Sequence, residues 1–525
     1  MNRSVTFKYA SGALSHFAAS VILPLLLIFS MVCESARIAN QKAVFSSALY
    51  LSSFSALSSY CKEVHSDYGL FLLQMDEKEL SDEISLYLNK NLMTCSDLSS
   101  AYNSFYRPES LSYQIDNLTY ITDCDGQLFA RSVINYSKDT LIPHISELIL
   151  SEMCQNINTI NENPKVFTEF EDLKLSDLEE NDVSSVWDKL LSGFDNSTKD
   201  NFKDILQETN PSFRDVSLSI DKLFDTMITI FSSSLLSLIV NDPTNLSQLT
   251  ISSEHLPSET VMHSENDPAD NTGFDSLKPL SGSTISETSD KLFYTIYLGD
   301  KFPCFTDYPE TSTDSLPLLY QLEYILCGES KDVYNLLVTA TAMVMIRASC
   351  NLLYLFTDSD KLSDAKSAAE KMAAGLASFP GIVEILTFFI LTVWAIAEGV
   401  IDCRDLLDNK KVALVKSPHT WTLDIENIGS LLVTKSKNPG DSGLTYKEYL
   451  LALLALQNDT TTYFNTMDMI QVTTAQKYGC RFIIKDCLYG FSGTLKTENT
   501  HIFNFIGNSF MNKQYSVTNT LTLTY

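Results

Sequence analysis

The sequence predicts an α+β protein that is mainly helical. A single N-terminal transmembrane helix is followed by a large extracytoplasmic domain, which has a helical core and small antiparallel β elements. Three observations predict this fold class. Residues 17–33 form an uncharged apolar run, apolar residues recur with helical spacing over most of the remaining chain, and polar and apolar residues alternate near the C-terminus.

The composition excludes two classes of protein. The 525 residues include 37 Lys and Arg against 65 Asp and Glu, which gives a formal net charge of −28. Because a polyanion is bound by clustered basic side chains, nucleic acid is not expected as a partner. Hydrophobic residues make up 45% of the chain and charged residues only 19%, which is typical of a folded protein and not of a disordered one.

The apolar run near the N-terminus (FAASVILPLLLIFSMVC) has the minimum length of a transmembrane helix, and the uncharged residues before it extend it. We therefore expect a transmembrane anchor at residues 13–35, preceded by a cytoplasmic N-terminus at residues 1–12. Arg3 and Lys8 precede the run and Glu34 follows it, and positive charge stays on the cytoplasmic side of a membrane. This pattern predicts a single-pass protein of the cell membrane with its N-terminus inside and its bulk extracytoplasmic.

A cleaved signal peptide is the alternative interpretation of this segment. The small-x-small pattern near its end, at residues 33–36, places Glu34 where the cleavage site needs a small residue. An uncleaved anchor is therefore favoured.

A second apolar stretch lies at residues 381–400. Glu384 and Glu398 leave only thirteen uncharged residues between them, which is the length of a buried core helix, and carboxylates are costly inside lipid. We interpret the stretch as the central helix of a soluble core, with a second membrane span as the alternative.

Residues 36–240 are expected to form an extracytoplasmic, N-terminal helical part with short strands. The segment 76–93 carries acidic residues early and a lysine late, as the helix dipole favours. Residues 111–120 and 127–135 are interpreted as strands on either side of a turn-type sequence at 123–126. Helical patterns return at 140–160 and 216–240.

Residues 241–290 are predicted to be a flexible Ser/Thr/Pro linker, because too little of this segment is apolar to offset the entropy of ordering it. Residues 291–525 are expected to form an extracytoplasmic helical core with C-terminal strands. The helices are predicted at 334–356, 363–377, 381–407, 446–457 and 460–473, and the strands at 481–495 and 515–525.

The sequence contains no recognisable motif for nucleotide binding, zinc proteolysis or serine hydrolysis. We assign no catalytic, cofactor-binding or metal-binding residue and expect no enzyme activity, no cofactor and no small-molecule ligand. Two structural pairs are predicted instead. Arg347, the one charged residue in a long apolar run, is expected to pair with the buried Glu398, although Glu384, Glu398 and Asp402 could also form an acid/base site. Cys480 and Cys487 flank a strand-like run and are the candidate disulfide.

Two resemblances follow from particular residues. The N-terminal segment, with Leu-Pro-Leu-Leu-Leu at 23–27 and an acid at Glu34, resembles the single-span anchor of TadE-type minor pseudopilins of tight-adherence pili. The Glu that this family usually carries six residues before the Pro is Ala18 here.

Most of the chain resembles an uncharacterised family of clostridial envelope proteins, a domain of unknown function often encoded beside tight-adherence pilus genes. The matching segments are ESAR (34–37), DYGLFLL (67–73), EYILCG (323–328), WAIAE (394–398), DCRDLL (402–407), YKEYL (446–450) and MDMIQ (467–471). The resemblance implies a topology and a genomic context, and it implies no activity.

These observations together lead us to expect a non-enzymatic single-pass envelope protein that is a structural or assembly component of a tight-adherence-type pilus or a related surface system. The expected partners are the membrane and pseudopilin or pilus-platform proteins. The alternative is an extracytoplasmic hydrolase or ligand-binding module whose site cannot be recognised from sequence.

Overall fold

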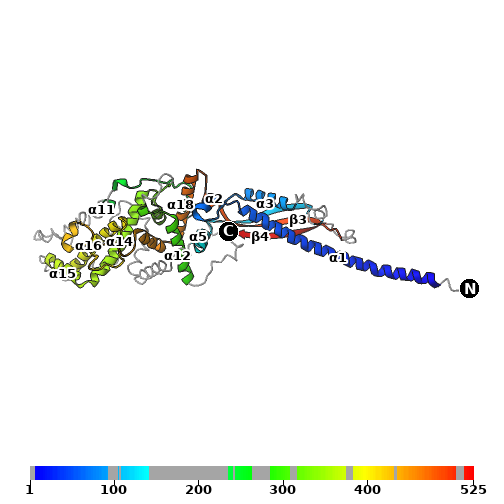
Figure 1. The fold of residues 1–525 in the computed structure, drawn as a ribbon, viewed down its shortest axis with the longest axis horizontal. Helices are drawn as coiled ribbons and strands as arrows, with labels where there is room; N and C mark the ends of the chain where they lie inside the picture. The colour runs from blue at the N-terminus through cyan, green and yellow to red at the C-terminus, as the bar shows by residue number, and fades with distance from the viewer. Residues whose placement is uncertain are drawn as a thin grey trace. The chain divides into compact units, whose positions relative to one another are not determined.

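The predicted combination of many helices and a small antiparallel sheet is confirmed in a computed structural model (Figure 1). The structure describes residues 6–92, 105, 108–140, 235–240, 243–262, 284–307, 316–373, 382–430, 434–503 and 514–525. The chain divides into two compact units. The described residues of unit 1 come from Met1–Cys124 and Ile483–Tyr525, and those of unit 2 from Asp125–Glu265 and Pro279–Phe482.

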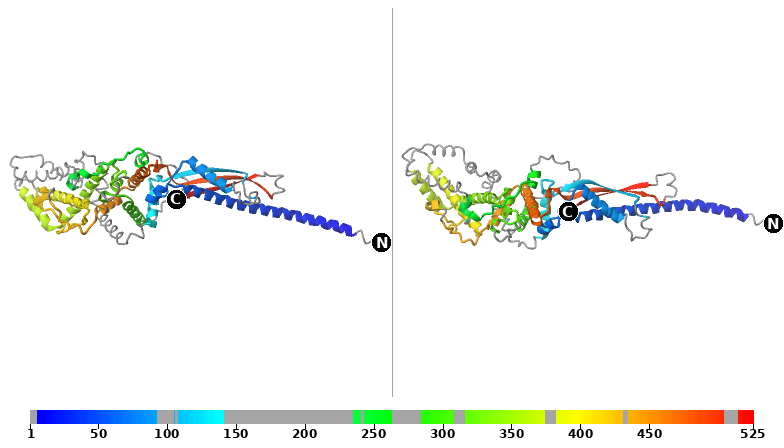
Figure 2. Two further views of the ribbon diagram at one scale, coloured as in Figure 1. Left: turned by 45° about the horizontal axis from the view of Figure 1, so that its top comes forward. Right: turned by 90° about the horizontal axis from the view of Figure 1, so that it is seen from above.

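Unit 1 is organised along α1 (Thr6–Leu57), a 52-residue helix that continues through Pro24. Its N-terminal half extends past the end of the strands (Figures 1 and 2). Only 6% of the most apolar window of this helix is buried within the structure, and its length and composition make it a candidate membrane span. The predicted N-terminal apolar helix is thus confirmed as a candidate anchor.

The sheet of unit 1 has four strands, all of them antiparallel: β1 (Leu73–Gln74), β2 (Ser110–Tyr120), β3 (Cys487–Thr500) and β4 (Gln514–Thr524). The central strand β3 pairs with β2 along one edge; β4 pairs with its other edge, which β1 extends at residues 487–488. The predicted strands at 111–120 and 515–525 are confirmed, whereas the predicted strand at 481–495 begins only at Cys487, after the 3₁₀ turn η9 (Ile484–Asp486).

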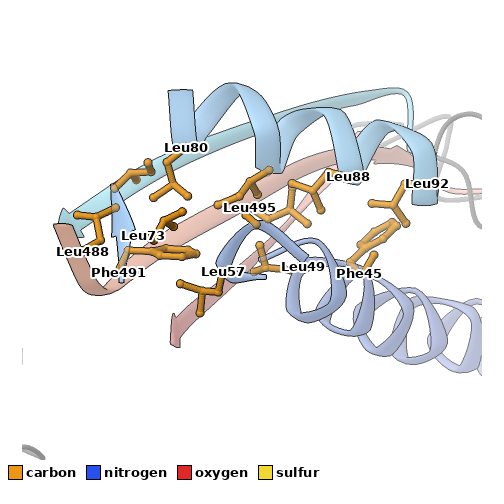
Figure 3. Packing of buried hydrophobic residues seen from close by; sticks show 14 of the residues in the cluster. Phe45, Leu49, Leu57, Leu73, Leu80, Leu88, Leu92, Leu488, Phe491 and Leu495 are labelled. Atoms are coloured by element: carbon orange, nitrogen blue, oxygen red, sulfur yellow. The ribbon is translucent and has the colours of Figure 1, made fainter. Parts of the chain in front are cut away.

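The core of unit 1 lies between the helices and one face of this sheet. In Figure 3 the helices α1 and α3 (Glu77–Leu92) direct leucine and phenylalanine side chains into one cluster over the strands; the short α2 (Lys62–Tyr68) connects α1 with β1. Along β3, Phe491, Leu495 and Thr497 are buried while Lys496 and Glu498 are exposed, so the sheet has one covered and one open face. Gly493 must lack a side chain, because a Cβ there would lie 2.1 Å from the Tyr113 hydroxyl.

The regular secondary-structure elements described in unit 2 are helices and short helical turns. Its α-helices are α5 (Gln127–Thr140), α11 (Leu235–Ile239), α12 (Thr284–Lys301), α13 (Gln321–Cys327), α14 (Asp332–Thr357), α15 (Ser359–Ala373), α16 (Ile382–Leu407), α17 (Tyr446–Leu456) and α18 (Asp459–Tyr478). The shorter turns are η3 (Pro243–Asn245), η4 (Ser258–Met262), η6 (Phe305–Asp307) and η8 (Ile425–Ser430). The helices predicted from residue 334 to residue 473 are confirmed.

Two sequence predictions differ from the structure. The strand predicted at 127–135 is wrong, because these residues belong to α5, which buries Leu128, Phe129 and Val133 along one face. The predicted linker at 241–290 contains folded structure in its described parts. Residues 243–262 pack on unit 2 through the buried Ile251 and Leu256, and α12 already begins at Thr284. The patterns at 141–234 and 263–283 lie outside the described residues.

Three helices in the described part of the chain are long and apolar enough to cross a membrane: α1, α14 and α16. They differ in what covers them. In α14 and α16, 67% and 78% of the most apolar window is buried inside the structure, against 6% in α1. The described part of this stretch, residues 382–400, lies within unit 2, and protein covers most of the apolar window of α16.

The packing in Figure 3 predicts different costs for two leucines of the same helix. Leu80 of α3 is completely buried, whereas Leu86 is 51% exposed. Leu80→Ala should cost about 2–5 kcal/mol of unit 1 stability through lost burial and a cavity, and Leu86→Ala should stay within about 0.5 kcal/mol. Hydrogen exchange of peptides from residues 487–500 in the detergent-solubilised chain measures this. Equal exchange in both variants would contradict the described core.

Candidate functional site

A polar region in the interior of unit 2 surrounds Arg347, which lies in the middle of α14 and is completely buried. Its Nε donates to Asp402 Oδ2 on α16 at 3.0 Å, and its Nη1 donates to the Leu414 carbonyl at 2.8 Å and to the Tyr449 hydroxyl at 3.1 Å. Its Nη2 donates to Asn351 Oδ1 at 3.3 Å. The guanidinium therefore connects α14, α16, α17 and the chain that follows α16.

Asp402 is shared between two cations. Its Oδ1 lies 2.6 Å from the Lys416 ammonium, while its Oδ2 binds Arg347. Lys416 also lies 2.7 Å from Glu398 Oε1, and the Glu398 carboxylate accepts the backbone N–H groups of Thr422 and Leu423, each at 2.9 Å. Two positive and two negative side chains thus balance in formal charge, with their side chains 0–2% exposed. We call Arg347, Glu398, Asp402 and Lys416 the ion network.

The predicted Arg347–Glu398 pair needs a correction. Both residues are buried, but the structure pairs Arg347 with Asp402, and Glu398 with Lys416. Glu398 and Asp402 are four residues apart on α16 and so lie one turn apart on the same side of the helix. Sequence spacing cannot choose between them. Lys416 comes from the irregular segment after α16, and no sequence pattern indicated it.

Close packing of α14 against α16 brings the charges together. Gly399 lies between Glu398 and Asp402 on α16, and a Cβ there would lie 3.0 Å from the Val344 carbonyl oxygen of α14. The absence of a side chain therefore lets the two helices approach at the level of the network.

Two tryptophans hold the segment that supplies Lys416. The indole N–H groups of Trp394 and Trp421 both donate to the Leu423 carbonyl, at 3.0 and 2.6 Å, and the two rings meet edge to face at 5.6 Å. The Lys361 ammonium lies 4.8 Å from the centre of each ring. These contacts fix Leu423, whose N–H group binds Glu398.

Another buried carboxylate, Glu323 of α13, lies outside the ion network. Its Oε1 accepts the Phe305 N–H and the Tyr446 hydroxyl, each at 2.8 Å, while Oε2 has no hydrogen-bond partner among the described residues. Burial raises the pKa of Glu323 to about 7, although these two hydrogen bonds lower it. Burial and the charge of Glu323 raise the pKa of the Cys304 thiol to about 12, so this cysteine is not an activated nucleophile.

Asp468 of α18 is a further buried acid. It accepts the Ser258 N–H at 3.1 Å and the Tyr324 hydroxyl at 3.0 Å, and burial raises its pKa to about 6. Ser258 belongs to the segment that was predicted to be a linker, so this contact attaches that segment to α18. In the part of the chain that the structure describes, no three His, Cys, Asp or Glu side chains gather in a group that could hold a metal ion.

The predicted Cys480–Cys487 disulfide is not present, because both residues are free thiols. Cys487 opens β3 with a buried side chain, and Cys480 is exposed after the end of α18. The two thiols therefore have different surroundings, although only six residues separate them.

The geometry of the ion network is suited to joining segments of chain. Each charged group has an opposite charge within 3.0 Å and is closed off from water, whereas acid/base catalysis needs a group within reach of a substrate.

The four residues of the ion network lie in a region of the chain that matches a known sequence family. A family model described as a family of unknown function, DUF5702, matches residues 216–499, which is more than half of the chain.

The chain belongs to this family. The expectation of a domain of unknown function is thereby confirmed. The DUF5702 region includes the whole ion network and most of β3, and it leaves out α1, α3 and β2. No curated protein and no solved structure matches the chain.

A double-mutant cycle can test the pairing within the DUF5702 region. Arg347→Met should cost about 3–5 kcal/mol, because it removes one partner of a buried pair. Its coupling energy with Asp402→Leu should fall in the range of about 0.5–3 kcal/mol, and its coupling with Glu398→Gln should be smaller. Denaturant unfolding followed by tryptophan fluorescence measures both, since Trp394 and Trp421 lie beside the segment that carries Lys416.

The control for this cycle is Lys437→Met. Lys437 lies 3.8 Å from Asp424, and both side chains are more than half exposed, so its loss should cost at most about 1 kcal/mol. A larger coupling of Arg347 with Glu398 than with Asp402 would restore the pair predicted from the sequence.

The raised pKa of Glu323 predicts how stability depends on pH. Below about pH 4.5 both the folded and unfolded states are protonated, and no penalty exists. As the pH rises from 4.5 to about 7 the unfolded state ionises first, so the folded state loses about 3 kcal/mol of relative stability. The full penalty persists above pH 7. Asp468 should add a similar loss at slightly lower pH, because its pKa is also raised.

Glu323→Gln removes this titration. The free energy of unfolding of the variant minus that of wild type should be larger at pH 8 than at pH 5. A constant cost of the buried amide would change both differences equally. The unfolding midpoints of both proteins at the two pH values measure the difference. A difference that does not change with pH would show that Glu323 ionises normally in the folded protein.

Proposed function

We propose that the chain is a non-enzymatic, single-pass protein of the cell envelope, inserted in the membrane by α1 with its N-terminus inside. We further propose that it is a structural or assembly component of a tight-adherence-type pilus or a related surface system. The observation that carries the proposal is the division of α1 into an uncovered apolar half and a half packed on a sheet.

The uncovered half exposes large apolar side chains all round the helix. Between 44% and 68% of each is exposed, and they are Phe17, Val21, Ile22, Leu23, Leu25, Leu26, Ile28, Phe29, Met31 and Val32. A monomeric protein in water rarely exposes so continuous an apolar surface, and lipid is the environment that covers one of this length. Arg3 and Lys8 before it and Glu34 after it support the orientation.

The packed half supports a single pass. From Glu34 onward α1 buries one face against the sheet, so the same unbroken helix leaves the membrane and enters unit 1. The other two apolar helices, α14 and α16, are mostly covered by protein, and α16 carries the buried Glu398 and Asp402. Lipid would not balance these charges as Lys416 and Arg347 do.

The outer face of α1 supports a role in assembly. Tyr50, Leu51 and Phe54 are 47–55% exposed, and Lys42 is the one charged residue between positions 38 and 57. A solvated helix face usually carries more charge than this. Ala18, Ala19 and Ser20 in the span would let neighbouring helices approach closely. An anchor helix that continues into an outer domain is the arrangement by which pseudopilin-like proteins join an assembly side by side.

The proposal predicts the effect of exchanging the span. The full chain should be extracted from membranes by detergent together with pseudopilin or pilus-platform proteins, and protease added outside wall-stripped cells should degrade residues after 50. Replacing residues 10–35 with an unrelated transmembrane segment should abolish the co-purification while the outer part keeps its protease pattern. Mass spectrometry of the purified complexes measures the partners.

The matched control is Tyr50→Ser with Phe54→Ser, which leaves the span intact. Loss of partners in this variant alone would move the contact to the outer face of α1. Protection of the outer part from external protease would reverse the orientation. Turnover of an envelope substrate by the purified chain, with no pilus protein recovered, would favour a hydrolase instead.

A further inference from the structure

The first charged residue after the apolar run, Glu34, holds a distant part of the chain. Its Oε1 lies 2.6 Å from Arg37 Nη2 and 3.1 Å from His501 Nδ1. Its Oε2 accepts the backbone N–H groups of Phe503 at 2.9 Å and Ile502 at 3.3 Å. The residues that follow β3 are therefore fixed at the level where the uncharged part of α1 ends.

Arg37 and Gln41, one and two turns further along α1, hold another segment at nearly the same level. Both donate to the carbonyl of Phe105, each at 3.2 Å. The Phe105 ring lies 5.8 Å from the Phe503 ring, and both are partly exposed. Two segments far apart in sequence thus place phenylalanine rings together beside α1.

The depth of these rings follows from the helix. An α-helix rises 1.5 Å per residue and the hydrocarbon core of a bilayer is about 30 Å thick, so a span that ends at residue 33 puts Glu34 at the edge of the core. Arg37 is then about 5 Å further out, within the headgroup layer. Glu34 and Arg37 neutralise each other there, which lowers the cost of charge close to lipid.

We propose that Phe105, Ile502 and Phe503 form a second membrane contact, which inserts into the interfacial layer of the phospholipid bilayer beside α1. This inference rests on the proposed insertion of α1. Phenylalanine and aliphatic side chains of segments that lie in the interface are buried at the boundary between the headgroups and the acyl chains. A lipid contact on one side of a span also sets its tilt and rotation, so unit 1 would hold one orientation relative to the membrane.

Photocrosslinking of the full chain tests the contact. A benzophenone amino acid replaces Phe503, and the protein is reconstituted in liposomes of phosphatidylcholine and phosphatidylglycerol. Lipid adducts on the peptide that contains residue 503 are expected on mass spectrometry. Two control positions on α1 bracket the result. Phe29 in the apolar run is 66% exposed and should form adducts. Phe54 is 54% exposed and about 30 Å beyond Glu34, and it should form none.

The controls separate the two proposals. No adduct at Phe29 would mean that α1 is not inserted, which overturns the proposed anchor and this inference with it. Adducts at Phe29 but none at Phe503 would overturn the second contact alone.

A second measurement covers the case in which the benzophenone disturbs folding. Subtracting the wild-type tryptophan fluorescence from that of Phe503→Trp gives the signal of the new indole. This signal should be quenched more by lipids brominated near the headgroup than by lipids brominated near the chain end. Equal or absent quenching by both lipids would also overturn the contact.

Discussion

The interior of unit 2 depends on the neutralisation of buried charge. Asp402 pairs with two cations through its two oxygens, Arg347 of α14 and Lys416 of the segment after α16. Removing any one of the four groups would leave the other three with an unbalanced charge in an environment that cannot solvate it. Gly399 supplies the close approach of α14 and α16 at the level of the network. Replacing a buried ion network by apolar residues of similar volume is often neutral or stabilising, so the network is weak evidence for net stability.

Much of this fold follows from local sequence patterns. The helices α3, α14, α16, α17 and α18 are long and periodic, and β2 and β4 alternate strongly enough to be predicted close to their observed positions. The prediction at 481–495 overlaps β3 but begins six residues before it and ends five residues before its end. The strand prediction for residues 127–135 was wrong because the short run QLFARSVIN also alternates in part. In unit 2 these residues form a helix that buries Leu128, Phe129 and Val133. The segment predicted as a linker at 241–290 contains folded structure, because residues 243–262 pack through isolated apolar side chains such as Ile251 and Leu256. Single polar contacts, such as that of Ser258 with Asp468, add to this packing. Neither kind of contact leaves an apolar periodicity in the sequence.

The candidate site was predicted only in part, for a geometric reason. The sequence indicated that Arg347 is buried and that α16 supplies its partner. It could not distinguish Glu398 from Asp402, since both lie on the same side of one helix. Lys416 and Tyr449 reach the site from two other places in the chain, and their types alone do not distinguish them from surface residues. Asn351 lies one turn from Arg347 on α14. Membership of DUF5702 places these residues in one family region without adding a role for them.

The route of the chain through unit 1 also determines when unit 1 can fold during synthesis. Its sheet pairs β2, which ends at Tyr120, with β3, which begins at Cys487, and the residues between belong mainly to unit 2. A ribosome adds about 5–20 residues per second, so β3 follows β2 by roughly 20–70 s. During that interval Phe45 and Leu49 of α1 have no β3 or β4 to cover them, so these apolar side chains stay partly uncovered until the last strands are made. Unit 2, whose described residues end at Phe482, can complete its core first, and unit 1 then closes with the last strands to be made.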